Sequence, residues 1–236
     1  DKYLWFGGYP GSEKLTDNET RWKRYIKSSL IETSISKDIL MLTRVNKPAL
    51  LHKLFDIGCS YSAQILSLTK IQGDLMEKGN LTTLSDYLAL LDAAGLLCGL
   101  EKYAGDIIRK RASKPKFQVY NNALLSAQSE FTFDEIINKG KEWGRIVESA
   151  VGSHLLNKAR EGYFDLYYWN ENSREVDYVL QKGSKVIAIE VKSGKDSINE
   201  GMALFNSKFH PHRLYTVGTN GIPLETFLTA NPEDLF

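Results

Sequence analysis

The sequence predicts a fold of the α+β or α/β class, with an N-terminal helical segment and a C-terminal mixed sheet flanked by helices. Apolar residues recur at helical spacing through most of the first half of the chain. Between Glu175 and Lys192 the period changes to two, as in two strands joined by a short turn. Around these strands the order is helix, three strands, helix, strand, which is typical of an α/β arrangement with a mixed sheet.

Length and composition are those of an ordinary globular protein. The chain has 236 residues, of which 42% are hydrophobic and 25% charged, so it is long enough for two small domains after a leader. We expect a helical leader at 1–47, a helical domain ending in a hairpin at 48–125 and the sheet domain at 126–236. The net charge of +1 gives no global argument for nucleic-acid binding, which must therefore depend on a local patch.

Cysteine content and apolar runs bear on the compartment. The two cysteines, Cys59 and Cys98, form no CxxC or Cys/His pattern, which favours a reducing compartment and no zinc. No signal peptide and no apolar run of about 18 residues is present. We therefore expect a cytoplasmic protein with no membrane contact.

The chain opens with Asp1 and an aromatic, glycine-rich stretch that ends at Gly11. This stretch predicts a turn with nothing before it to pack against, so we expect an excised fragment whose first residues are partly mobile. A helix is expected from about Asp17 to Thr43, because apolar residues recur there at spacings of three and four.

Residues 48–125 predict three short helices followed by two strands. Pro48 opens the first helix, and Gly58 is its expected end. The other expected elements are helices over Ser62–Asp74 and Thr82–Ala94 and strands over Leu96–Tyr103 and Asp106–Tyr120. Three helices and a two-stranded hairpin are the layout of a winged helix, in which the third helix and the hairpin (the wing) contact DNA.

The expected wing carries a basic run in a nearly neutral chain. Its members, our predicted nucleic-acid-binding residues, are Arg109, Lys110, Arg111, Lys114 and Lys116. Such a run is typical of a surface that follows phosphates. The third helix has no Lys or Arg and contains Asp86 and Asp92, so the wing is the expected contact with DNA. The alternative is a module that docks proteins.

A connector over Ser126–Gly140 leads to a helix expected over Glu142–Arg160, with Glu148 on its flank. Gly144 and Gly152 lie four residues to either side of Glu148. A glycine in a helix interior costs about 1 kcal/mol relative to alanine, so both glycines indicate a close approach of this helix to a sheet or a phosphate. The alternative is that Glu148 is an ordinary glutamate on the surface of a helix.

A β-hairpin over Glu175–Lys192 turns at Gly183–Ser184. If these two residues form the loop, Lys182 pairs with Lys185, and counting outward places Asp177 opposite Glu190 and Glu175 opposite Lys192. Strict alternation places one wholly apolar face on the core, made of Val176, Tyr178, Leu180, Ile187, Ile189 and Val191. A strand over Phe164–Trp169 precedes the hairpin. A helix over Ser197–Phe209 and a strand over Arg213–Val217 follow it, with His210 and His212 as loop residues between them.

Asp177 and Glu190 are therefore expected side by side. Like charges directly opposite each other destabilise a sheet, so this pair requires a cation or a shared proton. A divalent metal meets that need, with Asp177 and Glu190 as ligands. Repulsion between the carboxylates should raise the pKa of at least one of them. The alternative is an ordinary solvated face of an antiparallel hairpin.

The order of Asp177, Glu190 and Lys192 resembles the PD-(D/E)xK motif of a nuclease superfamily. The resemblance implies a restriction-endonuclease-like fold and a catalytic set of Asp177, Glu190, Lys192 and Glu148. In that family the carboxylates hold Mg²⁺ (or Mn²⁺), and the lysine positions or activates the attacking water.

The whole chain resembles the C-terminal half of bacterial and archaeal AAA-type ATPases that carry a domain of unknown function. The residues behind this resemblance are the Gly-Gly-x-Pro opening, the winged-helix layout running into Lys114–Tyr120, the Glu148 helix and the two strand motifs Glu-Val-Asp and Glu-Val-Lys. It implies an N-terminal ATPase domain as a partner. The chain has no GxxxxGK[ST] loop, so ATP would act only through that domain and we expect no ATPase activity here.

Two functions from different classes follow from these patterns. The chain is either part of an ATPase with a metal-dependent DNA nuclease site, or a non-catalytic module that docks DNA or protein and keeps a relic of the nuclease fold.

Overall fold

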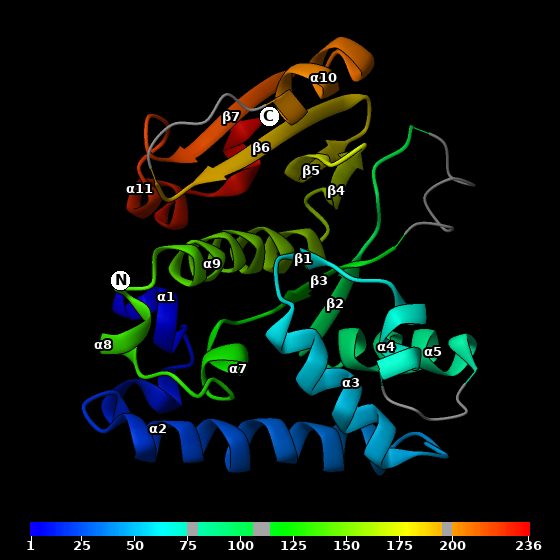
Figure 1. Ribbon diagram of the computed structural model, residues 1–236, viewed down its shortest axis with the longest axis vertical. Helices are drawn as coiled ribbons and strands as arrows, with labels where there is room; N and C mark the ends of the chain where they lie inside the picture. Colours follow the sequence, from blue (N-terminus) through cyan, green and yellow to red (C-terminus); the bar gives the residue numbers. More distant parts are fainter. Residues whose placement is uncertain (75–79, 106–113, 195–199) are drawn as a thin grey trace.

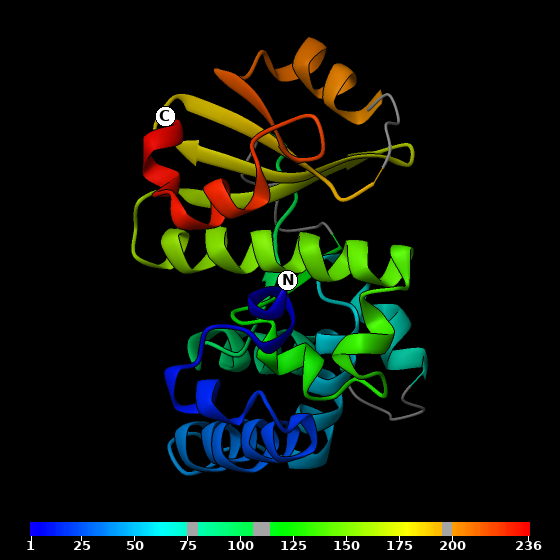
Figure 2. The ribbon, with the colours of Figure 1, turned by 90° about the vertical axis from the view of Figure 1, so that its left-hand side faces the viewer.

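A computed structural model describes residues 1–74, 80–105, 114–194 and 200–236 of the chain. The helix α9 (Gly140–Arg160) crosses the middle of the molecule, with the N-terminal helices on one side and a four-stranded sheet on the other (Figures 1 and 2). One side of α9 places Ile146 and Val147 in the core of the N-terminal part, and Val151 and Leu155 pack against the sheet. The helix is therefore shared by both halves.

The opening residues form a helix with a buried side, which corrects the expectation of a turn. α1 (Lys2–Phe6) buries Leu4, Trp5 and Phe6, and the indole Nε1 of Trp5 donates to Glu19 at 3.0 Å. The 3-10 turn η1 (Pro10–Leu15) follows. The long helix expected next is present as α2 (Glu19–Tyr25) and two π-helical segments, η2 (Ile26–Ile31) and η3 (Ser34–Leu40).

Between residues 48 and 119, the described part of the chain forms three helices and a three-stranded sheet. Pro48 occupies the first turn of α3 (Pro48–Ser60), and the side chain of Asn80 caps α5 (Leu81–Ala93) by accepting from the amide of Thr82. Between them lie β1 (Gln64–Ile65) and α4 (Leu68–Asp74). β2 (Leu97–Leu100) and β3 (Lys116–Val119) complete an antiparallel sheet of order β1-β3-β2.

The helix expected over Ser62–Asp74 is wrong in its first half. Ala63 has a positive φ of 62°, and its amide donates to the carbonyl of Phe117 at 2.8 Å. This backbone conformation ends α3 and turns the chain onto β3, so Gln64 and Ile65 become a strand. Residues 106–113 of the expected wing lie outside the described residues.

The C-terminal part is a mixed four-stranded sheet flanked by helices. Its order is β4 (Asp165–Glu171), β5 (Arg174–Lys182), β6 (Lys185–Lys192) and β7 (Arg213–Gly218), and only the β6–β7 pair is parallel. α9 covers one face of this sheet and α10 (Glu200–Phe209) the other, where Phe205 is fully buried. The predicted helical N-terminus and mixed, helix-flanked sheet are confirmed.

Short helices fill the connections. α7 (Ala123–Ser126) and α8 (Phe133–Ile136) lead from β3 to α9, and α8 begins with a capping box between Thr132 and Glu135. α11 (Leu224–Thr229) and the 3-10 turn η4 (Pro232–Leu235) end the chain. Among the described residues, no helix is both long and apolar enough to cross a membrane.

The hairpin of β5 and β6 has the predicted register at its turn, because Lys182 pairs with Lys185 and Tyr178 with Ile189. Strict alternation along β5 is wrong, however. Tyr167 of β4 pairs with Val179 while Trp169 pairs with Val176, so three steps along β5 match two along β4. This β-bulge moves Val176 to the α10 side of the sheet, whereas Tyr178 packs on the α9 side.

Candidate functional site

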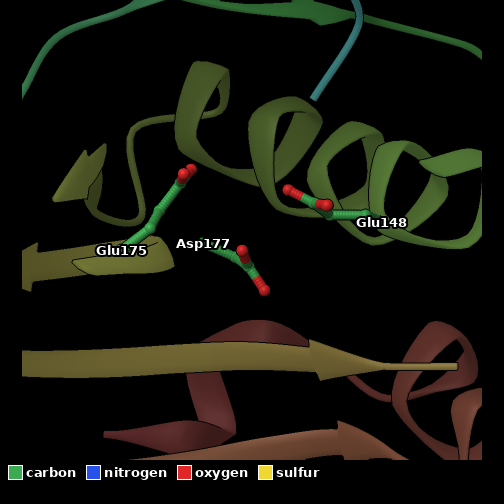
Figure 3. A group of neighbouring side chains, drawn as sticks. All are labelled: Glu148, Glu175 and Asp177. Atoms are coloured by element: carbon green, nitrogen blue, oxygen red, sulfur yellow. The ribbon is translucent and has the colours of Figure 1, made fainter. Parts of the chain in front are cut away.

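The candidate site lies where α9 crosses β5. Glu148 projects from the middle of α9 toward the sheet (Figure 3). The helix approaches closely there because it carries glycines at the right places. A Cβ on Gly152 would lie 2.1 Å from Oε1 of Gln118 and 2.2 Å from the hydroxyl of Tyr178, and one on Gly144 would lie 2.9 Å from Oγ of Ser193. The expectation of close packing around Glu148 is therefore confirmed.

β5 contributes the other two carboxylates. One oxygen each from Glu148, Glu175 and Asp177 lies within 4.8 Å of the other two, and these three residues are called the carboxylate cluster below (Figure 3). The bulge allows Asp177 and its neighbour Tyr178 to face α9 together, since the Tyr178 hydroxyl donates to the carbonyl of Glu148 at 2.9 Å. Asp177 is also fixed by the amide of Val191, which donates to its Oδ2 at 2.8 Å.

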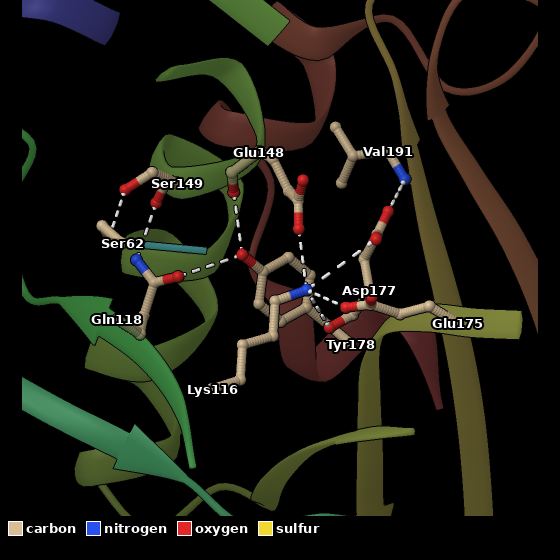
Figure 4. Close-up of polar contacts among 9 residues, drawn as sticks. All are labelled: Ser62, Lys116, Gln118, Glu148, Ser149, Glu175, Asp177, Tyr178 and Val191. Atoms are coloured by element: carbon tan, nitrogen blue, oxygen red, sulfur yellow. Dashed lines mark hydrogen bonds and ion pairs between the residues drawn. The ribbon is translucent and has the colours of Figure 1, made fainter. Parts of the chain in front are cut away.

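The ammonium of Lys116 lies among these carboxylates (Figure 4). Its Nζ is 2.7 Å from Oε1 of Glu148, 2.9 Å from Oε1 of Glu175 and 3.8 Å from Oδ1 of Asp177. It also donates to the backbone carbonyl of Asp177 at 3.2 Å and lies 4.9 Å from the centre of the Tyr178 ring. The Lys116 side chain is completely buried, whereas those of Glu148, Glu175 and Asp177 keep 23%, 35% and 14% of their surface exposed. Solvent therefore reaches the carboxylates but not the lysine.

The charges in this site influence one another strongly. Burial raises the pKa of Glu148 to about 8, the Asp177 carboxylate adds to the rise, and Lys116 opposes it. Burial alone would lower the pKa of Lys116, but the carboxylates of Glu148 and Asp177 outweigh it and hold this pKa well above its usual value. The prediction that crowding raises the pKa of at least one carboxylate holds for Glu148, with burial as the largest cause.

A buried polar network fixes the base of the site (Figure 4). Gln118, two residues after Lys116 on β3, donates to the carbonyl of Ser149 at 2.9 Å and accepts from the Tyr178 hydroxyl at 3.0 Å. The hydroxyl of Ser149 lies 2.8 Å from that of Ser62. β3, α9 and β5 are thus joined by side chains that water does not reach.

Glu190 and Lys192, two of the predicted catalytic residues, do not join the cluster. Oε1 of Glu190 is 3.0 Å from Nζ of Lys192. β6 alternates regularly, so these two residues share the side of Ala188, which packs toward α10, while Ile189 packs toward α9. Asp177 reaches the α9 side only through the bulge in β5. Among the described residues, the acidic group that could hold a metal ion therefore brings together Glu148 and Asp177, with Glu175 in the place expected for Glu190.

The predicted nucleic-acid-binding residues divide into three cases. The prediction that Lys116 contacts nucleic acid is wrong, because its fully buried ammonium is bound to carboxylates and is not on the surface. Lys114 is exposed, as a phosphate contact requires. Arg109, Lys110 and Arg111 lie outside the described residues.

Sequence reasoning missed the roles of Glu175 and Lys116. A signal for Glu175 exists in its position two residues before Asp177. The signal for Lys116 is weaker: Lys116 and Gln118 alternate with Phe117 and Val119, so one side of this strand is polar. That polar side is buried against α9 and β5, which no local pattern indicates.

The fold and site define a mixed α+β protein in which a helical segment inserts a buried lysine into the carboxylates of a sheet domain. Residues 1–135 match a family described as a domain of unknown function (DUF8612), and because this match spans more than half of the chain, the protein belongs to that family. Residues 143–227 match another domain of unknown function (DUF4143), which is found in AAA-ATPase-associated proteins. No curated protein and no solved structure matches the chain.

Proposed function

We propose that this chain is a nucleic-acid-associated module of an ATPase and that its carboxylate cluster is a nuclease-like site for a divalent cation, Mg²⁺ or Mn²⁺. The match of residues 143–227 to a domain found in AAA-ATPase-associated proteins supports the link to an ATPase. The winged-helix and restriction-endonuclease-like assignments belong to this proposal. They are supported by the element order of residues 48–119 and by the helix-flanked mixed sheet.

One observation carries the cation site. Oxygens bound to one divalent ion at roughly 2.0–2.6 Å lie at most about 4 to 5 Å apart. The oxygens of Glu148, Glu175 and Asp177 meet this condition, with no pair more than 4.8 Å apart. They come from two elements that a β-bulge and two helix glycines bring together, and all three side chains keep some contact with solvent.

The donor set fits a hard cation, since all three groups are carboxylates. A bound divalent cation would supply Lewis acidity at a phosphate oxygen or a bound water. The chain's own residues orient the site: Val191 holds Asp177 through its amide, and Tyr178 holds the α9 backbone at Glu148. Lys192 is the residue proposed to act on the attacking water. It pairs with Glu190 on the opposite side of the sheet from the carboxylate cluster, so the Lys192→Ala variant tests this role apart from cation binding.

Titration calorimetry with Mn²⁺ tests the site. Wild type should bind the ion and gain thermal stability from it, because binding only to the native state adds free energy of unfolding. Asp177→Asn and Glu175→Gln should each lose at least tenfold in affinity (about 1.4 kcal/mol). Glu190→Gln is the matched control and should retain binding. Loss of binding in Glu190→Gln with retention in Glu175→Gln would instead favour the ligand set expected from the sequence.

Cleavage of DNA tests the reaction separately. In Mn²⁺, wild type should nick single- or double-stranded DNA, Asp177→Asn should not, and Lys192→Ala should lose cleavage while it keeps ion binding. Binding without cleavage in wild type would contradict the nuclease reaction and leave the cation site.

The second candidate function, a non-catalytic module that docks DNA or protein, is favoured by the position of Lys116. A buried ammonium that already compensates the carboxylates would serve a relic site as a structural ion pair. Under this function, Mn²⁺ produces neither heat nor a thermal shift. If wild type still binds DNA, and this binding weakens as the salt concentration rises, the docking surface is one for nucleic acid.

A further inference from the structure

We propose that Lys116 is a tethered competitor for the cation site, so that a divalent cation can enter the carboxylate cluster only when the Lys116 ammonium leaves it. This inference rests on the proposed cation site and adds a regulation of that site. No feature of the sequence motif predicts it, because Lys116 lies far from Glu148, Glu175 and Asp177 along the chain.

The Lys116 ammonium fills the space between the three carboxylates. Nζ of Lys116 is within 2.7 and 2.9 Å of oxygens from two of the three carboxylates and within 3.8 Å of the third. A cation that used the same oxygens would have to lie in the space that the ammonium fills. Two positive groups at that separation repel each other, and no solvent screens them, because the Lys116 side chain is completely buried.

The lysine and the carboxylates come from different parts of the chain. Lys116 is the first residue of β3, and β3 pairs with both β1 and β2 of the N-terminal part, whereas the carboxylates belong to α9 and β5. The lysine is therefore supplied by the DUF8612 segment, and the carboxylates lie in the DUF4143 segment. Release of Lys116 would remove the bonds of its ammonium to Glu148, Glu175 and the carbonyl of Asp177, so occupation of the site would weaken one connection between the two segments.

The hydrogen bonds of β3 to α9 and β5 through Gln118 do not depend on the Lys116 ammonium. Gln118, further along β3, keeps its hydrogen bonds to Ser149 and Tyr178, and these do not involve the cluster oxygens. Displacement of the ammonium leaves these bonds in place. The three carboxylates around it keep some contact with solvent, so the ammonium lies close to the surface on their side.

Amine labelling of the wild-type chain tests the displacement. An acetylating reagent and tandem mass spectrometry report the reactivity of Lys116 and, as an internal reference, of the exposed Lys114. Without divalent ions Lys116 should be protected, because it is buried and charged, and at saturating Mn²⁺ its labelling should rise at least tenfold while that of Lys114 stays constant. Continued protection of Lys116 in protein that calorimetry shows to be saturated with Mn²⁺ overturns the proposal.

A variant gives the second readout. Lys116→Gln removes the positive charge and should bind Mn²⁺ at least tenfold more tightly than wild type, whereas Lys141→Gln, at an exposed position of α9, should bind like wild type. Equal or weaker binding by Lys116→Gln, with a circular dichroism spectrum like that of wild type, overturns the competition. Absence of Mn²⁺ binding in wild type and in Lys116→Gln overturns the cation site itself, so the two failures are distinguishable.

Discussion

Lys116 carries a buried positive charge whose stability depends on Glu148, Glu175 and Asp177. Removing two charges from water costs several kcal/mol per ion, and close carboxylates with additional hydrogen bonds repay that cost. Here the ammonium has two carboxylates within 2.9 Å and a backbone carbonyl at 3.2 Å. The dependence is mutual, because without Lys116 the carboxylates would face one another with no positive neighbour inside the cluster.

Replacement of Lys116 by methionine should therefore lower the free energy of unfolding by roughly 3 to 5 kcal/mol in metal-free buffer. Methionine keeps most of the side-chain volume but removes the charge. Lys114→Met, in an exposed position on the same segment, should change stability by no more than about 0.5 kcal/mol. Urea unfolding measures both, and equal stability of Lys116→Met and wild type would show that the buried ion pair is not stabilising.

The raised pKa of Glu148 predicts a pH dependence of stability. The carboxyl titrates near pH 8 in the folded protein, well above its ordinary value of 4.5, so the native state binds its proton more tightly than the unfolded chain does. This contribution is complete below the unfolded pKa and is lost as the pH rises toward about 8. In metal-free buffer, raising the pH from about 5 to about 8 should therefore lower the free energy of unfolding of wild type relative to that of Glu148→Gln.

Urea unfolding at several pH values checks this dependence. Glu142→Gln, on an exposed position of the same helix, is the matched control and should follow wild type. A parallel pH profile for Glu148→Gln and wild type would contradict the raised pKa.

The β-bulge in β5 and the glycines of α9 shape the site together. The bulge turns Asp177 toward the helix, and Gly152 lets the helix come close enough for Gln118 and Tyr178 to meet beside it. Neither element would form the site alone. An unbulged β5 would direct Asp177 to the α10 side, and a side chain at position 152 would separate α9 from the sheet.

Much of this arrangement could be predicted from the sequence. The turn at Gly183–Ser184 fixes the register of the hairpin, and the spacing of glycines around Glu148 indicates its close approach. The bulge could not be predicted, because the residues of β5 alternate regularly in the sequence and the extra step becomes visible only against β4. Lys116 could not be assigned either, since a lysine in a basic run has the same local pattern whether it is exposed or bound to distant carboxylates.

Gly152→Ala tests the contribution of the helix. Its Cβ would lie 2.1 Å from Oε1 of Gln118 and 2.2 Å from the Tyr178 hydroxyl, so the hydrogen bond between those groups must break or the helix must shift. We expect a loss of about 1–3 kcal/mol, as is usual for overpacking. Gly140→Ala, where a Cβ would meet nothing within 4 Å, should be neutral or slightly stabilising. Thermal unfolding separates the two, and equal midpoints would contradict the close packing.

The two family segments are joined through hydrogen bonds at two places along α9. Asn122 donates to the carbonyls of Leu4 and Ile146, which connects the opening helix to α9. At the other end of α9, the guanidinium of Arg160 donates to the carbonyls of Asp92 and Ala93 at the end of α5. Together with Lys116, these bonds distribute the connection along the whole helix.

We therefore expect the segments to unfold in one cooperative transition. Trp5 and Trp22 lie in the N-terminal core and Trp169 in the sheet, while the fourth tryptophan, Trp143 of α9, packs against the N-terminal core. In variants that lack Trp143, tryptophans kept in only one of these two regions report each segment separately. Their urea midpoints should coincide after correction for the effect of each substitution. Two separate transitions within one variant, followed by fluorescence and circular dichroism, would contradict the shared core.

The most direct test of the central claim is a crystal structure grown with Mn²⁺ and measured at the manganese absorption edge. We predict an anomalous peak among Glu148, Glu175 and Asp177, at roughly 2.0–2.6 Å from an oxygen of each. Nζ of Lys116 should be displaced from its position between them. An anomalous map without a peak at the cluster, with Lys116 still bonded to Glu148 and Glu175 at saturating Mn²⁺, would contradict the claim.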